Sequence, residues 1–356
     1  MAVQRLVVIG ASSGGLEALR TIASGLPAGF PAPICVVVHS APDAPGVLAA
    51  ILDRAGPLRA ITAATDMRLE NGRIFVAPPD WHLLVEPGLL RLSRGPKENR
   101  FRPAVDPLFR SAAQVFGPAA IGVVLTGSLD DGTAGLWAIK RLGGVAIVQD
   151  PLDALFPSMP QSAMRHVDVD HVLPLSRIAP ALLALVTTSL QDAPRPAVPP
   201  WMEVEMKIAR GGDPIAAGLE EMAEPSRYAC PECHGVLLRL KEAQPLRFRC
   251  HTGHAYSTES LLAAVRDGIE EALWNALRAI EERALLLDHL AMHAPIGNEA
   301  EDRTLADQAR AARRQAQTLR EMVEAPPIVD VPSPAMANPD APGSDQLSRN
   351  QPARSA

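Results

Sequence analysis

The chain has 356 residues, of which 47% are hydrophobic and 4% aromatic, so it can form a sizeable core made mainly of aliphatic side chains. Its formal net charge of −6 disfavours broad nucleic-acid binding and supplies no basic surface for an anionic membrane. No apolar run reaches the roughly 18 residues of a membrane span, and the N-terminal run is too short for a signal peptide. We therefore expect a cytoplasmic protein without nucleic-acid binding or membrane insertion.

Short apolar runs alternate with helical patterns through the first half of the chain. The Val- and Ile-rich runs that predict buried strands are Leu6–Ile9, Ile34–Val38, Ile74–Val76, Ile121–Leu125 and Val145–Val148. Helical spacing of apolar residues occurs between them at Leu16–Ser24, Gly46–Arg54 and Pro107–Val115. Two runs on either side of a Pro-Gly turn predict an inserted hairpin, Leu83–Val85 and Leu89–Leu92. This alternation predicts an α/β fold with a doubly wound, mainly parallel sheet and helices on both faces.

The first predicted strand runs directly into the sequence GASSGG at residues 10–15. This turn matches the G-x-S-x-G pattern of a nucleophile elbow, in which glycines on both sides let Ser12 project from the edge of the sheet. The free N–H groups of the helix that follows favour negative charge nearby. A glycine-rich turn after a first strand also binds phosphates or dinucleotides, so the motif alone leaves both kinds of site open.

Polar residues at two further strand ends favour a hydrolase. A dinucleotide-binding fold has an acidic residue after its second strand, whereas this chain has His39 there. The strand Ile121–Leu125 is followed by Asp130 and Asp131. Because the carboxyl ends of parallel strands meet at one edge of a sheet, we expect Ser12, His39 and one aspartate to lie close together. These are the three groups that acyl transfer requires.

The second half of the chain begins with a proline-rich stretch and continues with a cysteine cluster. The prolines predict a linker over residues 191–226. Within residues 227–257, a C-x₂-C pair and a C-x₃-H pair predict a structural Zn²⁺ site, with the ligands Cys230, Cys233, Cys250 and His254. His251 and His234 are alternative fourth ligands. Three cysteines clustered with histidines suit a reducing compartment and a metal better than disulfides.

A helical region is predicted over residues 258–324, in which two helices pair as an α-helical hairpin. The first runs from Thr258 to about His293, and the more polar second helix from Glu301 to Val323. The apolar residues that recur at helical spacing along the first helix are Leu262, Val265, Ile269, Leu273, Ala276, Ile280 and Leu287. The apolar stripe of the first helix needs a partner, which is the second helix, another subunit or a signalling protein. Residues 325–356 are rich in Pro, Ser, Asn and Asp, which predicts a disordered tail.

Four separated motifs resemble the catalytic domain of the CheB protein-glutamate methylesterases: IGASSGG, VVVHSAP, FRPAVDPLFRSAA and LTGSLDDGTAG. The resemblance covers about Leu6 to Val186, and we place the catalytic domain at residues 1–190. It implies that Ser12 is the nucleophile, His39 the base and Asp131, rather than Asp130, the orienting acid. The family also implies oxyanion donors at the backbone N–H groups near Ser13 and Ser128. Arg102 and Asp106, in the third motif, are expected to be cleft or structural residues.

The resemblance implies a carboxylic ester hydrolase that needs no cofactor for catalysis. Its substrate would be a methylated chemoreceptor or similar protein in chemotaxis-like signal transduction, and the same chemistry would allow glutamine deamidation. Because the first strand begins at Leu6, we expect no receiver domain before the esterase. The family's usual Gly-Met-Gly is here Gly127-Ser128-Leu129, a change that touches the cleft.

Two other functions compete with this interpretation. One is a catalytically silent module that binds a receptor or signalling protein through its C-terminal helices. The other is a nucleotide-binding oxidoreductase, which His39 disfavours. For the hydrolase, we expect a chain ending near Thr188 to stay folded and to hydrolyse small esters, while losing selectivity for its protein substrate.

Overall fold

The computed structural model describes residues 3–190, 195–242, 244–293 and 299–324. The chain divides into two compact units, Met1–Ile269 and Glu270–Ala356. The long helix α9 (Thr258–Met292) passes from the first unit into the second. No helix in the described part of the chain combines the length and the hydropathy of a membrane span.

A seven-stranded parallel sheet forms the centre of the first unit, in the order β10-β9-β8-β1-β2-β5-β3. In chain order its strands are β1 (Leu6–Ala11), β2 (Ile34–Val38), β3 (Arg59–Thr62), β5 (Arg73–Val76), β8 (Ala120–Val124), β9 (Val145–Gln149) and β10 (His171–Leu173). Strands β1 and β8 are buried along their whole length, which explains their unbroken aliphatic sequences. The direction of winding reverses between β1 and β8, and such a switch point opens a crevice at the carboxyl ends of the strands.

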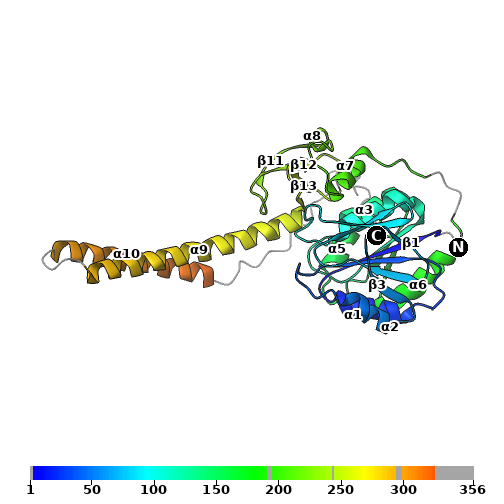
Figure 1. Cartoon of the computed structure of the whole chain (residues 1–356), viewed down its shortest axis with the longest axis horizontal. Helices are drawn as coiled ribbons and strands as arrows, with labels where there is room; N and C mark the ends of the chain where they lie inside the picture. The colour runs from blue at the N-terminus through cyan, green and yellow to red at the C-terminus, as the bar shows by residue number, and fades with distance from the viewer. Residues whose placement is uncertain (1–2, 191–194, 243, 294–298, 325–356) are drawn as a thin grey trace, which may run out of the picture. The chain divides into compact units, whose positions relative to one another are not determined.

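Helices cover both faces of this sheet (Figure 1). One face carries α1 (Gly15–Gly25), α2 (Leu48–Ala55) and α6 (Leu175–Thr187). The other carries α3 (Val105–Phe116), α4 (Thr133–Arg141) and α5 (Ser158–His166). Each face has its own apolar core, with Ile22, Leu52 and Leu182 in the first and Phe109, Leu136 and Met159 in the second. The predicted doubly wound α/β fold is therefore confirmed.

The predicted hairpin is also present, as β6 (His82–Glu86) and β7 (Leu89–Ser93). Together with β4 (Met67–Arg68) it makes a three-stranded antiparallel sheet. The hairpin is tied to α3, because the Ser111 hydroxyl accepts a hydrogen bond from the Val85 backbone N–H at 3.0 Å. A short 3₁₀ turn, Gly117–Ala119, connects α3 to β8.

The proline-rich range 191–226 is not a linker over most of its length, and that prediction was wrong. It contains α7 (Pro200–Ala209), α8 (Leu219–Met222) and the start of β11 (Ala223–Ala229). Pro200 is the first residue of α7, where proline is favoured because its missing N–H would have no helical partner. Met202 and Met206 of α7 are fully buried in the core beside α3. Residues 191–194 lie outside the described residues.

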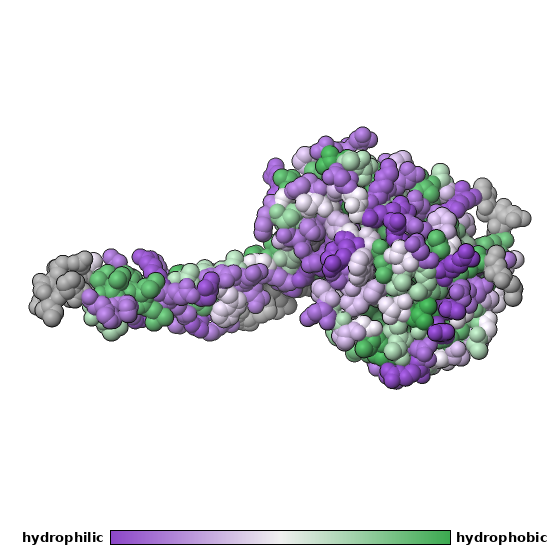
Figure 2. All heavy atoms as spheres, viewed as in Figure 1, coloured by the Kyte–Doolittle hydropathy of each residue, from purple (hydrophilic) through white to green (hydrophobic). Residues whose placement is uncertain are grey.

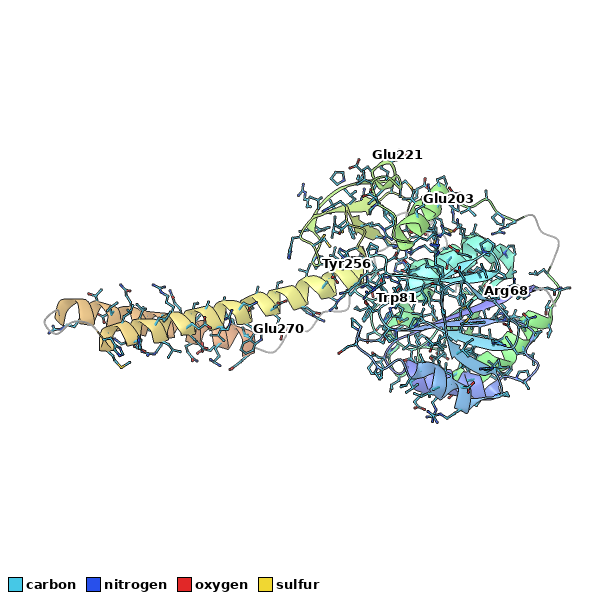
Figure 3. The ribbon with its side chains drawn as sticks, viewed as in Figure 1. Arg68, Trp81, Glu203, Glu221, Tyr256 and Glu270 are labelled. Atoms are coloured by element: carbon cyan, nitrogen blue, oxygen red, sulfur yellow. The ribbon has the colours of Figure 1, made fainter. Side chains whose placement is uncertain are left out.

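A four-stranded antiparallel sheet follows, with strands in the order β11, β12 (Val236–Leu240), β13 (Arg247–Cys250) and β14 (Ala255–Ser257). We call residues 223–260, which comprise these strands and the first turn of α9, the Cys/His segment. It has only a small core of its own, which includes Leu237, Phe248 and Tyr256. Tyr256 lies on β14 beside the start of α9 (Figure 3).

A cluster of buried charges joins the Cys/His segment to the catalytic fold. Its members are three arginines and two glutamates, each at most 3% exposed: Glu98, Arg110, Glu205, Arg247 and Arg249. Arg249 on β13 bridges Glu98 and Glu205, with 3.0 Å between nitrogen and oxygen in both pairs. Because an unpaired buried charge is very unfavourable, the catalytic fold and the segment need each other to neutralise these groups.

In the described residues of the second unit, the remainder of α9 is followed by α10 (Glu299–Glu324). Ion pairs Arg320–Glu281 and Arg313–Asp288 show that the two helices run antiparallel, as the predicted hairpin requires. Small residues allow close packing between the two helices, because four of the five buried apolar residues described there are alanines: Leu277, Ala284, Ala309, Ala312 and Ala316. Apolar side chains gather toward the end of the helical pair in Figure 2, where Leu285, Leu286, Leu290 and Met292 are exposed. The predicted tail 325–356 lies outside the described residues.

The predicted apolar stripe of α9 is only partly buried. Leu262, Val265 and Ile269, in the first unit, are 64%, 43% and 57% exposed. The buried positions of that stretch are their neighbours Leu261 and Ala263. Over residues 258–269, helical spacing therefore predicted the wrong face, whereas Leu273, Ile280 and Leu287 farther along the predicted stripe are partly buried.

Candidate active site

Ser12 stands in the turn between β1 and α1, at the carboxyl edge of the parallel sheet. Gly14 has a φ of 76°, a conformation that glycine adopts without strain. Gly127 approaches the serine so closely that a Cβ there would lie 2.8 Å from Ser12 Cβ and 2.1 Å from Met159 Sδ. Glycines at these two positions therefore let the chain make the sharp turn on which Ser12 stands, half-buried.

His39 follows β2 directly and lies between Ser12 and Asp131. Its Nδ1 is 3.1 Å from Ser12 Oγ, and its Nε2 is 2.7 Å from Asp131 Oδ2. The ring of Phe101 stacks on the imidazole, with centroids 3.8 Å apart and planes 4° from parallel. The imidazole is thus held at both nitrogens and on one face, with its side chain only 3% exposed.

Asp131 is the most highly coordinated carboxylate of the site. Its donors are His39 Nε2, the Val105, Asp106 and Gly132 backbone N–H groups, and the Asn99 side-chain amide, all at 2.7–3.2 Å. Burial by itself would raise the pKa of Asp131, but the hydrogen bond and charge of His39 and the bonds from Val105 and Asn99 hold the pKa below its ordinary value. Asp131 therefore stays ionised, as an acid that orients an imidazole must.

Asp130, next along the chain, has a different environment. Its Oδ1 accepts a hydrogen bond from the Ser257 hydroxyl at 2.7 Å, on the Cys/His segment. Burial raises the pKa of Asp130 to about 8. Of the two adjacent aspartates, the structure places Asp131 and not Asp130 against His39.

The other residues singled out in the FRPAVDPLFRSAA motif have supporting positions. Asp106 is buried, and its Oδ1 accepts hydrogen bonds from the Gly132 and Gly135 N–H groups at 3.1 and 2.6 Å. Burial and the neighbouring Asp131 carboxylate raise the pKa of Asp106 to about 7. Arg102 binds Asp80 Oδ1 at 2.7 Å and lines the cleft.

The two predicted oxyanion positions lie side by side next to Ser12. The hydroxyls of Ser13 and Ser128 are 3.4 Å apart. Neighbouring N–H groups are already used, since the Ser12 N–H donates to Thr126 O and the Gly127 N–H to Phe156 O. Within the described residues, no acceptor is assigned to the N–H groups of Ser13 and Ser128. They remain available to an oxygen bound beside Ser12.

A cleft of about 530 Å³ opens over Ser12 and His39. The remaining lining residues are Ser13, Ser40, Ala41, Pro42, Lys97, Arg100, Phe101 and Arg102. The basic residues on its rim are paired with acidic ones: Lys97 with Glu232 at 3.1 Å, Arg100 with Asp267, and Arg102 with Asp80. The rim is thus polar and locally neutralised, and it suits an ester rather than a highly charged ligand.

Comparison with known proteins agrees with this geometry. Residues 7–182 match the CheB methylesterase family model. A putative protein-glutamate methylesterase/protein-glutamine glutaminase from Leptospira interrogans is 39% identical over 187 residues, which cover 52% of this chain and 97% of that protein. The chain belongs to the CheB methylesterase family.

Two further relatives extend the comparison. The protein-glutamate methylesterase FrzG of Myxococcus xanthus is 41% identical over 182 residues, which are 51% of this chain and 54% of FrzG. The crystal structure of the Thermotoga maritima CheB methylesterase catalytic domain is 36% identical, with a TM-score of 0.50. It covers 52% of this chain and 100% of the Thermotoga chain. The family match ends at residue 182, before α7 and the Cys/His segment.

Sequence analysis missed several residues that contact the site. Asn99 lies two residues before the FRPAVD motif and Phe101 is the first residue of that motif, but no spacing marks either of them as part of the site. Ser257 and Ser260 lie in the distant Cys/His segment. The only available signal was the run ENRF at residues 98–101, which overlaps the start of the motif. It carries no period or ligand pattern, so only the folded structure relates these residues to Asp131.

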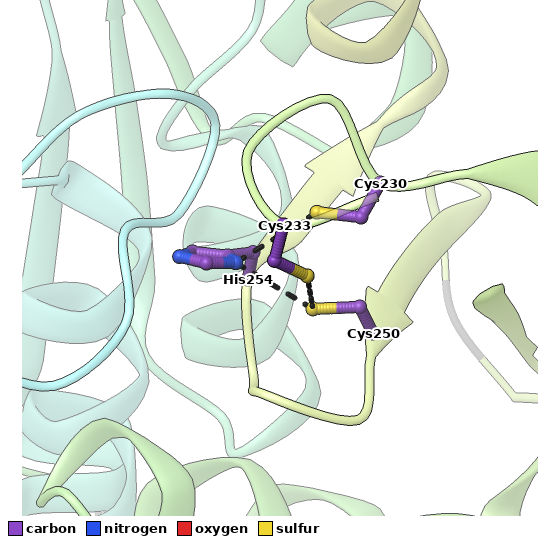
Figure 4. Close-up of side chains that lie close together, drawn as sticks. All are labelled: Cys230, Cys233, Cys250 and His254. Atoms are coloured by element: carbon purple, nitrogen blue, oxygen red, sulfur yellow. Dashed lines mark hydrogen bonds between the residues drawn. The ribbon is translucent and has the colours of Figure 1, made fainter. Parts of the chain in front are cut away.

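The predicted metal ligands come together at the end of the four-stranded sheet. The ligand atoms of Cys230, Cys233, Cys250 and His254 all lie within 4.8 Å of one another, and Figure 4 shows the four side chains converging. Cys233 Sγ and Cys250 Sγ are 3.6 Å apart, and His254 Nδ1 is 3.7 Å from Cys230 Sγ. Tetrahedral zinc with bonds of 2.3 Å to sulfur requires ligand separations of about 3.8 Å, so these residues fit the ion. Among the described residues, His234 and His251 are not members of the cluster.

Proposed function

We propose that this chain is a protein-glutamate methylesterase, a carboxylic ester hydrolase with Ser12, His39 and Asp131 as its catalytic residues. The observation that supports this most strongly is the imidazole of His39, bonded to Ser12 Oγ on one side and Asp131 Oδ2 on the other. Family membership supports the same reaction, since the relatives from Leptospira and Myxococcus are named protein-glutamate methylesterases.

In the first half of the reaction, Ser12 Oγ attacks the ester carbonyl of a methylated glutamate side chain. His39 Nδ1 takes the Ser12 proton, while the Nε2–H remains bonded to Asp131. The N–H groups of Ser13 and Ser128 stabilise the negative charge on the carbonyl oxygen. Collapse of the tetrahedral intermediate breaks the bond to the methoxy group, which leaves as methanol with the proton from His39.

In the second half, water hydrolyses the acyl-enzyme. His39 Nδ1 accepts a proton from water as the oxygen attacks the acyl carbonyl. The Ser12–acyl bond then breaks, and Ser12 regains its proton from His39. The products are a glutamate side chain and free enzyme. An amide in place of the ester would release ammonia by the same steps, so glutamine deamidation is a second reaction of this site.

The proposed substrate is a methylated chemoreceptor or a receptor-like protein of a chemotaxis-type pathway, met in the cytoplasm. The polar, neutralised cleft accepts a side-chain ester presented at a protein surface. The exposed apolar residues of the C-terminal helices, including Leu285 and Leu290, are proposed to contact a signalling partner.

For the Cys/His segment we propose a structural Zn²⁺ held by Cys230, Cys233, Cys250 and His254. Bound zinc would fix the β11–β12 and β13–β14 turns relative to each other. The ion has no role in the ester chemistry, because the cluster shares no residue with the cleft over Ser12.

Methanol release from a methylated receptor of the source organism tests the function directly. Wild-type protein is expected to release methanol in proportion to enzyme and time, whereas Ser12→Ala protein does not. Ser40→Ala provides a matched control, because Ser40 lines the same cleft without contacting His39 in the described hydrogen bonds. Receptor binding without methanol release from wild-type protein would instead support the catalytically silent module.

A further inference from the structure

One loop of the catalytic fold touches both the base and the acid of the triad. This loop, Lys97–Phe101, carries Phe101, which stacks on the His39 imidazole at 3.8 Å. It also carries Asn99, whose Nδ2 donates to Asp131 Oδ1 at 2.9 Å. Asn99 is 3% exposed, so these contacts are shielded from water. The conformation of the loop therefore determines the geometry of the His39–Asp131 pair.

The Lys97–Phe101 loop has an unfavourable backbone conformation. Asn99 and Arg100 have φ values of 49° and 77°, in the left-handed region. Two consecutive non-glycine residues in this region are unfavourable, so contacts with the rest of the structure must stabilise the loop.

Those contacts come from the Cys/His segment. The Asn99 N–H donates to Ala255 O at 2.8 Å, and the Ala255 N–H donates to Lys97 O at 3.2 Å, so β14 pairs with the loop through backbone hydrogen bonds. Both basic residues of the loop also pair with acidic residues beyond the catalytic domain, Lys97 with Glu232 and Arg100 with Asp267. The loop is thus held along its length by residues 232–267.

The side chain of Asn99 connects the Cys/His segment to the triad. Its Oδ1 accepts hydrogen bonds from the Ser257 N–H at 3.0 Å and the Ser260 hydroxyl at 3.2 Å. A backbone N–H can only donate, so Ser257 fixes which end of the amide is oxygen. The Nδ2 group must then face the carboxylates of Asp106 and Asp131, each at 2.9 Å. Every hydrogen-bonding position of this buried amide is occupied.

A second contact supports the turn that carries the triad acid. The Ser257 hydroxyl donates to Asp130 Oδ1 at 2.7 Å, and the Ser260 N–H donates to the same hydroxyl at 3.0 Å. Asp130 directly precedes Asp131, so this hydrogen bond joins Ser257 to the turn that carries Asp131 without involving Asn99. Two paths therefore lead from the junction of β14 and α9 to the catalytic acid, one through Asn99 and one through Asp130.

We propose that the Cys/His segment is a functional part of the active site, in which Ser257 and Ser260 hold Asn99 as a positioning residue for Asp131. The measurement of ester turnover rests on the proposed methylesterase function, whereas the hydrogen-bonded arrangement is independent of it. Without the two serine hydroxyls, Asn99 Oδ1 keeps only the Ser257 N–H as a donor and Asp130 loses its hydrogen bond, so the His39–Asp131 pair loses its alignment. The segment thereby sets the catalytic rate without contacting the substrate.

The test uses full-length Ser257→Ala/Ser260→Ala protein. Since two buried hydroxyl contacts are lost, we expect kcat for a small methyl ester to fall about tenfold or more while KM stays within about twofold. Ser111→Ala is the matched control, because it removes a buried serine hydroxyl from α3 that bonds Val85 and Leu108. This control should lose comparable thermal stability and keep its kcat. A folded double variant with a kcat within about twofold of wild type overturns the proposal.

Asn99→Asp is the second variant, in case the double serine variant does not fold. It keeps an acceptor for Ser257 and Ser260 but replaces the amide donor by a carboxylate between Asp106 and Asp131. We expect kcat to fall by about 100-fold, since repulsion displaces the acid from His39. Wild-type turnover in this variant would also overturn the proposal.

A spectroscopic readout separates this proposal from the methylesterase assignment. His39 Nε2 and Asp131 Oδ2 are 2.7 Å apart. The proton between them should give a downfield NMR resonance in wild-type protein. The resonance should shift or broaden in both variants and persist in Ser111→Ala. If wild-type protein hydrolyses no ester yet shows this pattern, the proposed function fails and the positioning role stands. An unchanged resonance in the variants contradicts the positioning role.

Discussion

Two adjacent aspartates illustrate how environment assigns roles to identical side chains. Asp131 accepts five hydrogen bonds and has a lowered pKa, whereas burial raises the pKa of Asp130 to about 8. At neutral pH the first is a carboxylate and the second largely a carboxylic acid. The turn between β8 and α4 therefore provides the Asp131 charge to the triad, while Asp130 is buried in a hydrogen bond with Ser257.

This difference predicts opposite outcomes for two amide variants. Asp131→Asn should lower kcat by about 10⁴-fold, because the imidazole loses the acceptor that fixes its tautomer. Asp130→Asn should leave kcat within about threefold of wild type, since the neutral amide resembles the protonated acid. Ester hydrolysis by both purified variants is the measurement. Equal losses in the two would contradict the assignment of Asp131.

The difference in stability between wild-type and Asp130→Asn protein should also depend on pH in a defined direction. The folded state keeps the Asp130 proton up to about pH 8, whereas the unfolded chain releases it near pH 4. The contribution of Asp130 to stability is therefore full below about pH 4 and falls by up to about 1.4 kcal/mol per pH unit as pH rises toward 8. In denaturant unfolding between pH 4 and 8, the free energy of unfolding of Asp130→Asn protein should rise relative to that of wild-type protein as the pH rises. A constant difference from pH 4 to 8 would contradict the raised pKa.

Sequence reasoning at the residue scale found the groups that do the chemistry and missed those that hold them. Ser12, His39 and Asp131 each follow a strand of the parallel sheet, so strand prediction alone brought them to one edge. Asn99 belongs to an irregular loop with left-handed residues, and its partner Ser257 is 158 residues away in sequence. No local pattern encodes such a contact.

Among the elements, the four-stranded sheet is the one that we propose a bound zinc ion stabilises. Its own core is small, and its strand ends carry Cys230, Cys250 and His254. His254 directly precedes Ala255, the residue of β14 that pairs with the Lys97–Phe101 loop. The local sequence predicted that these four side chains come together, because zinc ligands occur in short, recognisable pairs. Its connection to the triad came only from the structure.

Cys233→Ser should therefore affect both the metal and the esterase. We expect zinc content to fall from about one ion per chain to a small fraction, with a lower thermal unfolding midpoint, because metal binding and folding of such segments are coupled. Ester hydrolysis should fall as well, since β14 no longer holds its loop. Cys35→Ala is the control, because Cys35 lies buried in β2 outside the cluster. Zinc-free wild-type protein with unchanged unfolding and activity would argue against a structural ion.

The proline-rich range 191–226 shows why composition led to a wrong prediction of a linker. Prolines before residue 200 suggested a linker, yet Pro200 begins α7, whose buried Met202 and Met206 pack against α3. Proline marks the start of a helix as readily as an extended chain. The deciding information is which apolar faces remain uncovered on α3, and that is a tertiary property.

At the scale of the whole molecule, the catalytic fold and the Cys/His segment form one unit through residue 269. The buried charges of Glu98 and Arg110 are completed by Glu205, Arg247 and Arg249 from beyond residue 190. Removing partners from such a cluster costs about 3–5 kcal/mol, a large part of the 5–15 kcal/mol that stabilises a typical domain. The expectation that a chain ending near Thr188 stays folded is therefore revised.

Two truncations make this revision testable. A chain ending at Ile269 should fold cooperatively and hydrolyse small esters at about the full-length rate, because it keeps every contact described for the triad. A chain ending at Thr188 should unfold at much lower denaturant concentration or aggregate, since it exposes α3 and the charge of Glu98. Unfolding curves and ester hydrolysis of the two chains are the measurements. Equal stability and rate in both would show that the segment is dispensable.

The central claim is that His39 and Asp131 activate Ser12 as a nucleophile. Replacing Ser12 by alanine should lower esterase turnover by about four to six orders of magnitude, as for other triad serines. The most direct measurement is labelling of the full-length protein with a fluorophosphonate probe, followed by mass spectrometry of the labelled peptide. We expect one label per chain, on Ser12, and no label in Ser12→Ala protein. Asp131→Asn protein should be labelled much more slowly than wild type. A label on another residue, or an unlabelled Ser12 in protein that still hydrolyses the ester, would contradict the central claim.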